Sequence, residues 1–239
     1  MIDLRGVTKK FGSFTAVDDI SLLVPPGEFF GFLGPNGAGK TTTIKMMAGL
    51  FSPTSGQIFI NGYDVVQQPL EAKSFMSYVP DQPFLYDKLT GREFLYFIGG
   101  LYKMEKKLVA AKIEEVIARL EIGEWVDKRT EDYSQGMRQR LTIAAALVHE
   151  PKVFIIDEPM VGLDPRSAKI VRETLRQMAH HGASIFMSTH SLPIAEELCD
   201  RVGFIKDGRL VFVGTQEHLQ AYKQKFDGNF ESVFLELTK

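Results

Sequence analysis

Eight consecutive residues have the types and the spacing needed to hold a chain of phosphates. They match the pattern G-x-x-x-x-G-K-[ST], in which glycines let successive backbone N–H groups turn toward the phosphates. In such a loop Lys40 reaches the outer phosphates and the Thr41 hydroxyl can ligate Mg²⁺. We therefore predict a triphosphate site made of Gly34, Pro35, Asn36, Gly37, Ala38, Gly39, Lys40, Thr41 and the adjoining Thr42.

Two acidic residues and one histidine follow apolar runs elsewhere in the chain. Asp157 and Glu158 come directly after residues 153–156, and His190 follows the run 183–188. The carboxyl ends of strands in open α/β sheets face the ligand, so Asp157 is placed to hold Mg²⁺ and Glu158 to polarise a water. The alternative for the two acids is that they cap the next helix, and a lone histidine is more often structural than catalytic.

The elements that must position these residues are short strands and helices in alternation. Residues 28–33 predict a strand that leads into the glycine loop, and residues 41–50 continue as a helix. Residues 152–156 and 183–188 are almost wholly apolar, which is typical of parallel strands buried on both faces. Residues 165–181 between them have the length of a crossover helix.

The remaining segments divide into a β portion and a helical portion. Strands are predicted at 2–4, 20–24 and 57–60, and a hairpin with a type I′ turn at 202–213. Helices are predicted at 92–102, 109–120 and 137–149, whereas residues 230–237 fit either a strand or a helix. We therefore expect an α/β fold with a mostly parallel sheet, an antiparallel β subdomain and a helical subdomain inserted at about 84–149.

Composition excludes some classes of protein. The formal net charge of the 239 residues is −2, which argues against a chain whose main work is binding nucleic acid. The single cysteine, Cys199, allows no internal disulfide and favours a reducing compartment. The sequence contains neither a signal-peptide pattern nor an apolar run long enough to span a bilayer. We expect a cytosolic chain, held at a membrane only through another protein.

Four further motifs, in order and spacing, support a resemblance to a known family. Residues 133–140, YSQGMRQR, are similar to the signature usually written LSGGQ, and residues 153–159 to a Walker B strand with its glutamate. Residues 162–165 resemble a D-loop, and residues 188–190 resemble a switch-histidine motif. From about Leu4 to Gly214 the sequence thus resembles the nucleotide-binding domain of ABC transporters. The resemblance implies a P-loop NTPase with a RecA-like core, one domain over 1–230 and a C-terminal tail over 231–239.

The resemblance also implies roles for individual residues. The chain would be an ATPase in which Lys40 and Mg²⁺ neutralise the γ-phosphate while Glu158 and His190 place the attacking water. Phe11 sits where the family places an aromatic ring against the adenine. Ser134 and Gly136 would bind the ATP of a second, homologous subunit, so that each site is shared by two chains that close on it.

In two places the sequence departs from the family pattern. Position 135 is a glutamine where the family commonly has glycine, and Met137 replaces the usual polar residue. In the glutamine loop, Asp81 stands at the usual glutamine position and Gln82 follows it. Either side chain could reach the metal or the water; we predict Gln82 as a metal-site residue beside Thr41 and Asp157, and the choice between positions 81 and 82 stays open.

The function implied is that of the energy-coupling subunit of a transporter, with a separate transmembrane permease as partner. The apolar cluster Phe84, Leu85 and Tyr86 would contact that permease, unless it serves local core packing. The form of residues 134–140 is reminiscent of ABC-2 type exporters. The alternative is a non-transport ABC ATPase of the assembly-scaffold type, and a small-molecule kinase would leave residues 134–140 without an explanation.

Overall fold

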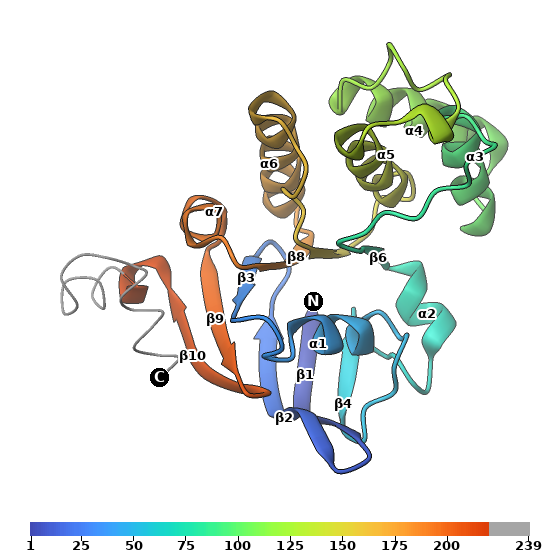
Figure 1. Ribbon diagram of the computed structural model, residues 1–239. Helices are drawn as coiled ribbons and strands as arrows, with labels where there is room; N and C mark the ends of the chain where they lie inside the picture. Colours follow the sequence, from blue (N-terminus) through green and yellow to red (C-terminus); the bar gives the residue numbers. More distant parts are fainter. Residues whose placement is uncertain (220–239) are drawn as a thin grey trace.

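A six-stranded sheet forms the centre of the molecule, with strand order β10-β9-β3-β8-β7-β6 (Figure 1). The structure, a computed structural model, describes residues 1–219. Neighbouring strands pair in parallel except β9 and β10, so the predicted mostly parallel sheet is confirmed. The strands are β3 (Phe29–Leu33), β6 (Met76–Val79), β7 (Val153–Asp157), β8 (Ser184–Thr189), β9 (Arg201–Lys206) and β10 (Arg209–Thr215).

The central strands are buried on both faces, and their residues alternate between two apolar cores. In β7, Phe154 and Ile156 belong to one core, whereas Val153 and Ile155 belong to the other. This period of two explains the continuous apolar runs in the sequence, because each successive side chain meets a different packed layer. The second core also contains Ile44 of α1 (Lys40–Met47). The helix that follows the phosphate loop is therefore held firmly beneath the sheet.

A separate antiparallel sheet packs on the second core. Its strand order is β2-β1-β4-β5, with β1 (Ile2–Phe11), β2 (Phe14–Val24), β4 (Ser55–Ile60) and β5 (Tyr63–Asp64). The antiparallel β portion was predicted, but β1 and β2 are longer than expected. Register shifts between Leu4 and Val7 and between Val7 and Lys9 interrupt the alternation of buried and exposed residues. The second half of β1 therefore lacks the sequence pattern that predicts a strand.

Three helices lie between β6 and β7 in the chain and gather at one end of the sheet in Figure 1. They are α3 (Gly91–Leu101), α4 (Lys106–Arg119) and α5 (Gln135–Leu147), with a 3₁₀ turn at Thr130–Asp132 before α5. The other helices are α2 (Pro69–Ser74), α6 (Pro165–His180) and α7 (Leu192–Leu198). The domain boundaries at 84–149 and 230 stay predictions. The tail at 231–239 and the element at 230–237 lie outside the described residues.

None of the helices described within residues 1–219 combines the length and the apolar character needed to cross a membrane. The hairpin predicted at 202–213 is present as β9 and β10. Its turn residues Asp207 and Gly208 both have positive φ, at 48° and 80°, as a type I′ turn requires.

Candidate functional site

The phosphate loop connects β3 to α1 at the carboxyl edge of the central sheet. Gly39, the residue before α1, has a φ of 109°, and a Cβ there would lie 2.6 Å from the carbonyl oxygen of Ala16. Only glycine fits this position. No side chain among residues 1–219 caps the N-terminus of α1, and its first turn contains no acidic residue. The first-turn N–H groups and the positive end of the helix are therefore free to receive phosphate oxygens.

Lys40 is buried within the loop that it follows. Its Nζ donates hydrogen bonds to the carbonyl oxygens of Gly34 at 2.6 Å and Pro35 at 3.1 Å. Burial lowers the pKa of Lys40, while the charges of Glu158 and Asp157 act in the opposite direction. A phosphate oxygen can replace either carbonyl and offers the ammonium a negative charge at hydrogen-bond distance.

Asp157 connects the loop to the strands behind it. Its side chain is only 3% exposed, accepts a hydrogen bond from the Ser188 hydroxyl, and lies 3.4 Å from the Thr41 hydroxyl that donates to it. Burial raises the pKa of Asp157, and the charges of Asp81 and Glu158 raise it further. A buried carboxylate facing a threonine hydroxyl at the end of a strand is a hard-oxygen donor pair suited to a divalent cation.

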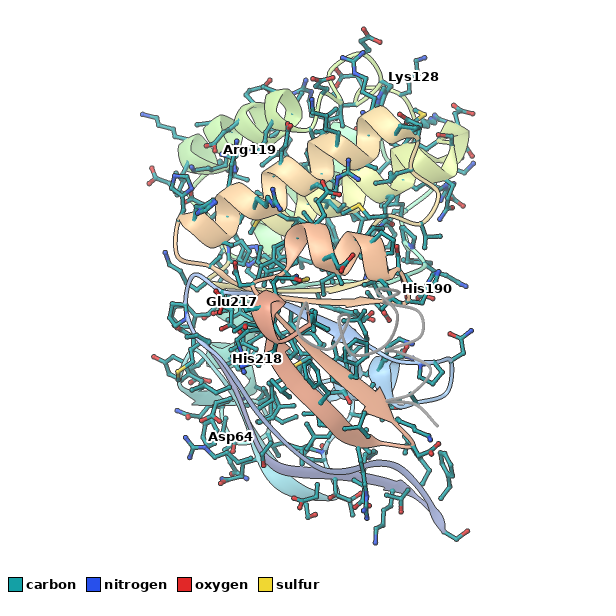
Figure 2. All side chains as sticks on the ribbon, turned by 90° about the vertical axis from the view of Figure 1, so that its left-hand side faces the viewer. Asp64, Arg119, Lys128, His190, Glu217 and His218 are labelled. Carbon is teal, nitrogen blue, oxygen red and sulfur yellow. The ribbon has the colours of Figure 1, made fainter. Side chains whose placement is uncertain are left out.

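Glu158 and His190 face each other at the same edge. The Glu158 carboxylate accepts hydrogen bonds from the His190 backbone N–H at 2.9 Å and from the Thr189 hydroxyl at 3.3 Å, and its Oε1 lies 2.8 Å from His190 Nδ1. Glu158 has a φ of 48°, which is uncommon for a residue other than glycine. Figure 2 shows His190 at the surface beside the start of α7. The pair can orient a water in front of it.

The donor set fits Mg²⁺ rather than a transition metal. Within residues 1–219 no three histidine, cysteine or acidic side chains gather as a metal-binding group. The Thr41 hydroxyl and the Asp157 carboxylate would instead offer two oxygen ligands, the kind of site in which phosphates and waters complete the shell of Mg²⁺.

The glutamine-loop residues lie near Asp157 to different degrees. Asp81 is close enough for its charge to raise the pKa of Asp157, and burial together with Asp157 and Asp81 raises the pKa of Tyr78 to about 12. Gln82 is exposed, and its backbone N–H donates to the Asp81 carboxylate at 2.8 Å. The choice between positions 81 and 82 for the glutamine-loop role stays open. Gln82 as a metal-site residue stays a prediction.

Phe11 lies at the end of β1, away from the carboxylates. Its ring is 45% exposed and packs edge-on against Phe51 with centroids 5.7 Å apart. The Lys9 ammonium lies 5.1 Å from the ring centroid. An exposed aromatic ring with a cation beside it is suited to stacking on a base, but its adenine contact stays a prediction.

Ser134 and Gly136 begin α5, and the described residues do not bring them into the cluster around Lys40. The Ser134 hydroxyl accepts a hydrogen bond from the Met137 backbone N–H at 3.3 Å and so caps the helix. A Cβ on Gly136 would lie 3.1 Å from the carbonyl oxygen of Gly162. Ser134 is exposed, so the start of α5 is accessible to another chain.

Some residues near the site lie in motifs identified from the sequence but were given no role of their own. Ser188 and Thr189 hold the two carboxylates, and Gln139 of α5 donates to the carbonyl oxygen of Pro159 at 3.3 Å. The register of β7 against β8 pairs Asp157 with Ser188, so the strand order is the signal that would have identified the serine.

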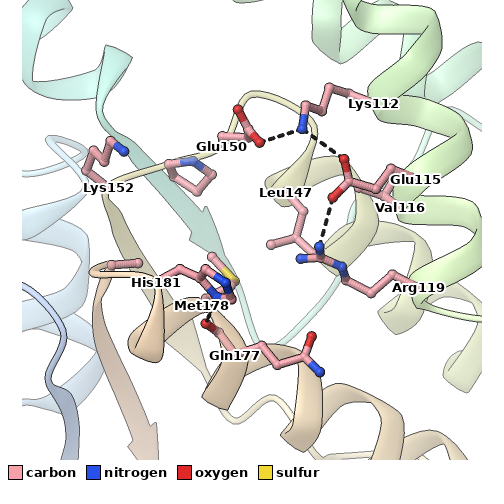
Figure 3. Close-up of a pocket in the computed structure, with 12 residues that line it drawn as sticks. Lys112, Glu115, Val116, Arg119, Leu147, Glu150, Lys152, Gln177, Met178 and His181 are labelled. Carbon is pink, nitrogen blue, oxygen red and sulfur yellow. Dashed lines mark hydrogen bonds and ion pairs between the residues drawn. The ribbon is translucent and has the colours of Figure 1, made fainter.

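A cavity of about 280 Å³, here called the rear cavity, lies at the opposite edge of the sheet (Figure 3). The residues that precede β7 and β8 border it, so it lies at the amino ends of these strands. Four of its charged side chains pair with one another: Lys112 bonds Glu115 at 2.8 Å and Glu150 at 2.5 Å, and Arg119 bonds Glu115 at 2.8 Å. The rear cavity is thus separate from the phosphate loop.

The sequence matches the family model described as ABC transporter over residues 17–161. The ABC transporter ATP-binding protein NatA of Bacillus subtilis is 36% identical, and the match covers 96% of each chain. The linearmycin resistance ATP-binding protein LnrL of Bacillus subtilis is 37% identical over 92% of this chain and 70% of that protein. The probable multidrug ABC transporter ATP-binding protein YbhF of Escherichia coli is 35% identical, over 99% of this chain and 41% of its own length.

Solved structures agree with the sequence comparisons. The ATP-binding subunit of an ABC transporter superposes with a TM-score of 0.92 at 30% identity, with all of both chains covered. A dimeric ATP-binding cassette solved in a post-hydrolysis state with ADP and phosphate has the same fold, with a TM-score of 0.81 at 24% identity over 90% of this chain and 99% of that one. The chain therefore belongs to the ABC transporter family, as one of its ATP-binding and ATP-hydrolysing subunits.

Proposed function

We propose that this subunit powers an exporter by hydrolysing ATP at the carboxyl edge of its central sheet. The observation that carries the proposal is the Glu158 carboxylate, which bonds His190 and Thr189 one residue beyond the buried Asp157. In this arrangement Glu158 accepts a proton from the attacking water and His190 orients that water toward the γ-phosphate. Lys40 and the first-turn N–H groups of α1 stabilise the charge that develops on the phosphate.

We propose that the Thr41 hydroxyl and the Asp157 carboxylate hold Mg²⁺. When bound, the cation neutralises negative charge on the β- and γ-phosphates. The burial that raises the pKa of Asp157 supports the assignment, because a carboxylate kept from water gains most from a cation beside it. Phe11 stacks on the adenine, with its exposed ring as the support.

We also propose that each site is shared by two nucleotide-binding subunits. Ser134 and Gly136 of one subunit cover the γ-phosphate bound to Lys40 of the other, and the exposure of Ser134 at the start of α5 supports this. ATP then joins the two subunits and hydrolysis releases them, a rigid-body switch that depends on the γ-phosphate.

A patch of three exposed aromatic side chains supports docking to a transmembrane permease. Phe84, Tyr86 and Phe97, here the aromatic patch, pack edge-on with centroids 5.7 Å and 5.3 Å apart. Phe84 is 77% exposed, whereas its neighbour Leu85 is buried and serves the local core. Phe84 of the aromatic patch lies three residues after Asp81, whose charge acts on Asp157, so a partner bound there would sense the state of the site.

The subunit would then lie on the cytoplasmic face of the membrane through its permease. The relatives named for linearmycin resistance and probable multidrug transport support export as the direction. Purification of the tagged chain from membranes of its source tests this partner. We expect a multi-spanning protein to be retained by the wild type and lost with Phe84→Ser.

Leu70→Ser is the matched control, because Leu70 of α2 is 81% exposed and lies outside the aromatic patch. We expect this variant to retain the multi-spanning protein. Recovery of soluble assembly proteins in place of a membrane protein would contradict the transporter function and favour the scaffold type of ABC ATPase.

A further inference from the structure

Two glutamines of α5 contact the segment that follows Glu158. Gln139 is 1% exposed, and its Nε2 donates to the carbonyl oxygen of Pro159 at 3.3 Å. Gln135 covers Gly162: a Cβ on this glycine, whose φ is 77°, would lie 2.7 Å from Cγ of Gln135. One helix therefore holds the segment 159–162 at both of its ends.

The stability of the fold does not explain a glutamine at position 139. Its Oε1 is buried and has no hydrogen-bond partner among the described residues. A buried polar atom without a partner destabilises a protein, and an apolar side chain of similar volume would avoid this. The contact from Gln139 to the Pro159 carbonyl is thus kept at the expense of stability, which points to a role in the chemistry.

The segment that these glutamines hold determines where the Glu158 carboxylate points. Glu158 has a positive φ, and its carbonyl oxygen accepts a hydrogen bond from the Val161 backbone N–H at 3.3 Å. On its other side the Glu158 N–H donates to the carbonyl oxygen of Ser188 at 3.1 Å. The turn is thus fixed by β8 on one side and by α5 on the other.

We propose that Gln139 and Gln135 are positioning residues that link the start of α5 to the chain's own Glu158. The inference rests on the proposed function, in which Ser134 and Gly136 meet ATP bound to the other subunit. That contact fixes the position of α5. The two glutamines then transmit a shift of the helix to Pro159 and Gly162, which they contact. The carboxylate at 158 is then aimed most accurately at its water when the other site is occupied.

Gln139→Leu tests the proposal, because it removes the hydrogen bond without leaving a cavity. We expect kcat for ATP hydrolysis to fall about 10-fold, with the ATP affinity and the ATP-induced dimer unchanged. The melting temperature should stay the same or rise, since the orphaned oxygen is gone. Gln135→Ala should lower kcat about 3-fold, because only a packing contact is lost.

Thr142→Val is the matched control, since the Thr142 hydroxyl of α5 bonds only the helix's own Arg138 carbonyl. Its kcat should stay within about 2-fold of the wild type. In the Glu158→Gln background, Gln139→Leu should lower the residual rate no further, because it acts through the group already lost.

Two results would overturn the inference: an unchanged kcat in Gln139→Leu, or an equal further loss in the double variant. Its failure can be told apart from failure of the proposed function. If Glu158→Gln hydrolyses ATP at the wild-type rate, the catalytic assignment itself is wrong. If Glu158→Gln is inactive while Gln139→Leu is fully active, only the link through α5 is wrong.

Discussion

Two glutamates flank β7, and both have positive φ, at 53° for Glu150 and 48° for Glu158. Glu150 ends the α5 connection at the rear cavity, where its carboxylate pairs with Lys112 and its side chain is 67% exposed. Glu158 lies at the carboxyl edge, where its side chain is 18% exposed and bonds His190 and Thr189. Two glutamates with the same backbone conformation thus have different roles, and the residues around each one determine its role.

At Glu150 the positive φ is the ordinary left-handed residue after a helix, and its N–H donates to the carbonyl oxygen of Leu147. At Glu158 the positive φ follows the buried strand β7, and the carboxylate lies at the carboxyl edge of the sheet, where the phosphate loop also lies. At the rear cavity Lys112 pairs with Glu115 and Glu150, whereas the hydrogen-bond partners of Lys40 among the described residues are backbone carbonyls. The two edges therefore differ in the neighbours of the glutamate and in the buried Lys40, not in backbone conformation.

The largest expected effect is that of Glu158→Gln. Without the carboxylate no group accepts the proton of the attacking water, so we expect hydrolysis to fall by about 10³. ATP binding should be kept, and an ATP-stabilised dimer or partner complex should accumulate, measured by light scattering. Glu150→Gln is the matched control and should hydrolyse ATP at the wild-type rate; equal losses in both variants would remove the distinction drawn between the two glutamates.

A second prediction separates activity from stability at Asp157. Burial raises its pKa, so the folded chain holds that proton to higher pH than the unfolded chain does. The stability of the nucleotide-free protein therefore falls as pH rises through the window between the ordinary and the raised pKa, and stays lower above it. Asp157→Asn should lower hydrolysis by about 10² yet stabilise the free protein at neutral pH by about 1 kcal/mol.

Thermal unfolding at several pH values checks this prediction. The variant should show a higher melting temperature than the wild type at pH 7 and a smaller difference at the acid end of the window. A variant that is less stable than the wild type at pH 7 would show that the Asp157 charge is compensated inside the chain.

The smallest effect is expected at Glu150. Glu150→Gly relieves the left-handed strain but loses an exposed ion pair, so we expect a gain of about 0.5 kcal/mol in the free energy of unfolding. Glu150→Ala keeps the strain and loses the pair, and should be slightly less stable than the wild type. Urea unfolding measures the stability of both variants. A loss of ATP hydrolysis in either variant would contradict the comparison, because it would show that the rear edge takes part in catalysis.

The sequence predicted the parts of this site that depend on local pattern. The phosphate loop and the two buried strands before Asp157 and His190 follow from spacing and apolar runs. The bond from Ser188 to Asp157 needs the order of strands in the sheet, and the contact from Gln139 to Pro159 needs the packing of α5. Neither the order of the strands nor the packing of α5 can be predicted from a short stretch of sequence.

The central claim is that each ATP site is completed by a second subunit, and mixing two inactive variants tests it. Lys40→Ala removes the phosphate contact and Ser134→Arg blocks the start of α5, so each alone should hydrolyse ATP slowly. Random pairing makes about half of the dimers mixed, each with one complete site, so about a quarter of the wild-type rate should return if the sites act independently. About a tenth of that quarter should return if the empty second site leaves Glu158 without its link through α5. A mixture no faster than the average of its two components would contradict the shared site.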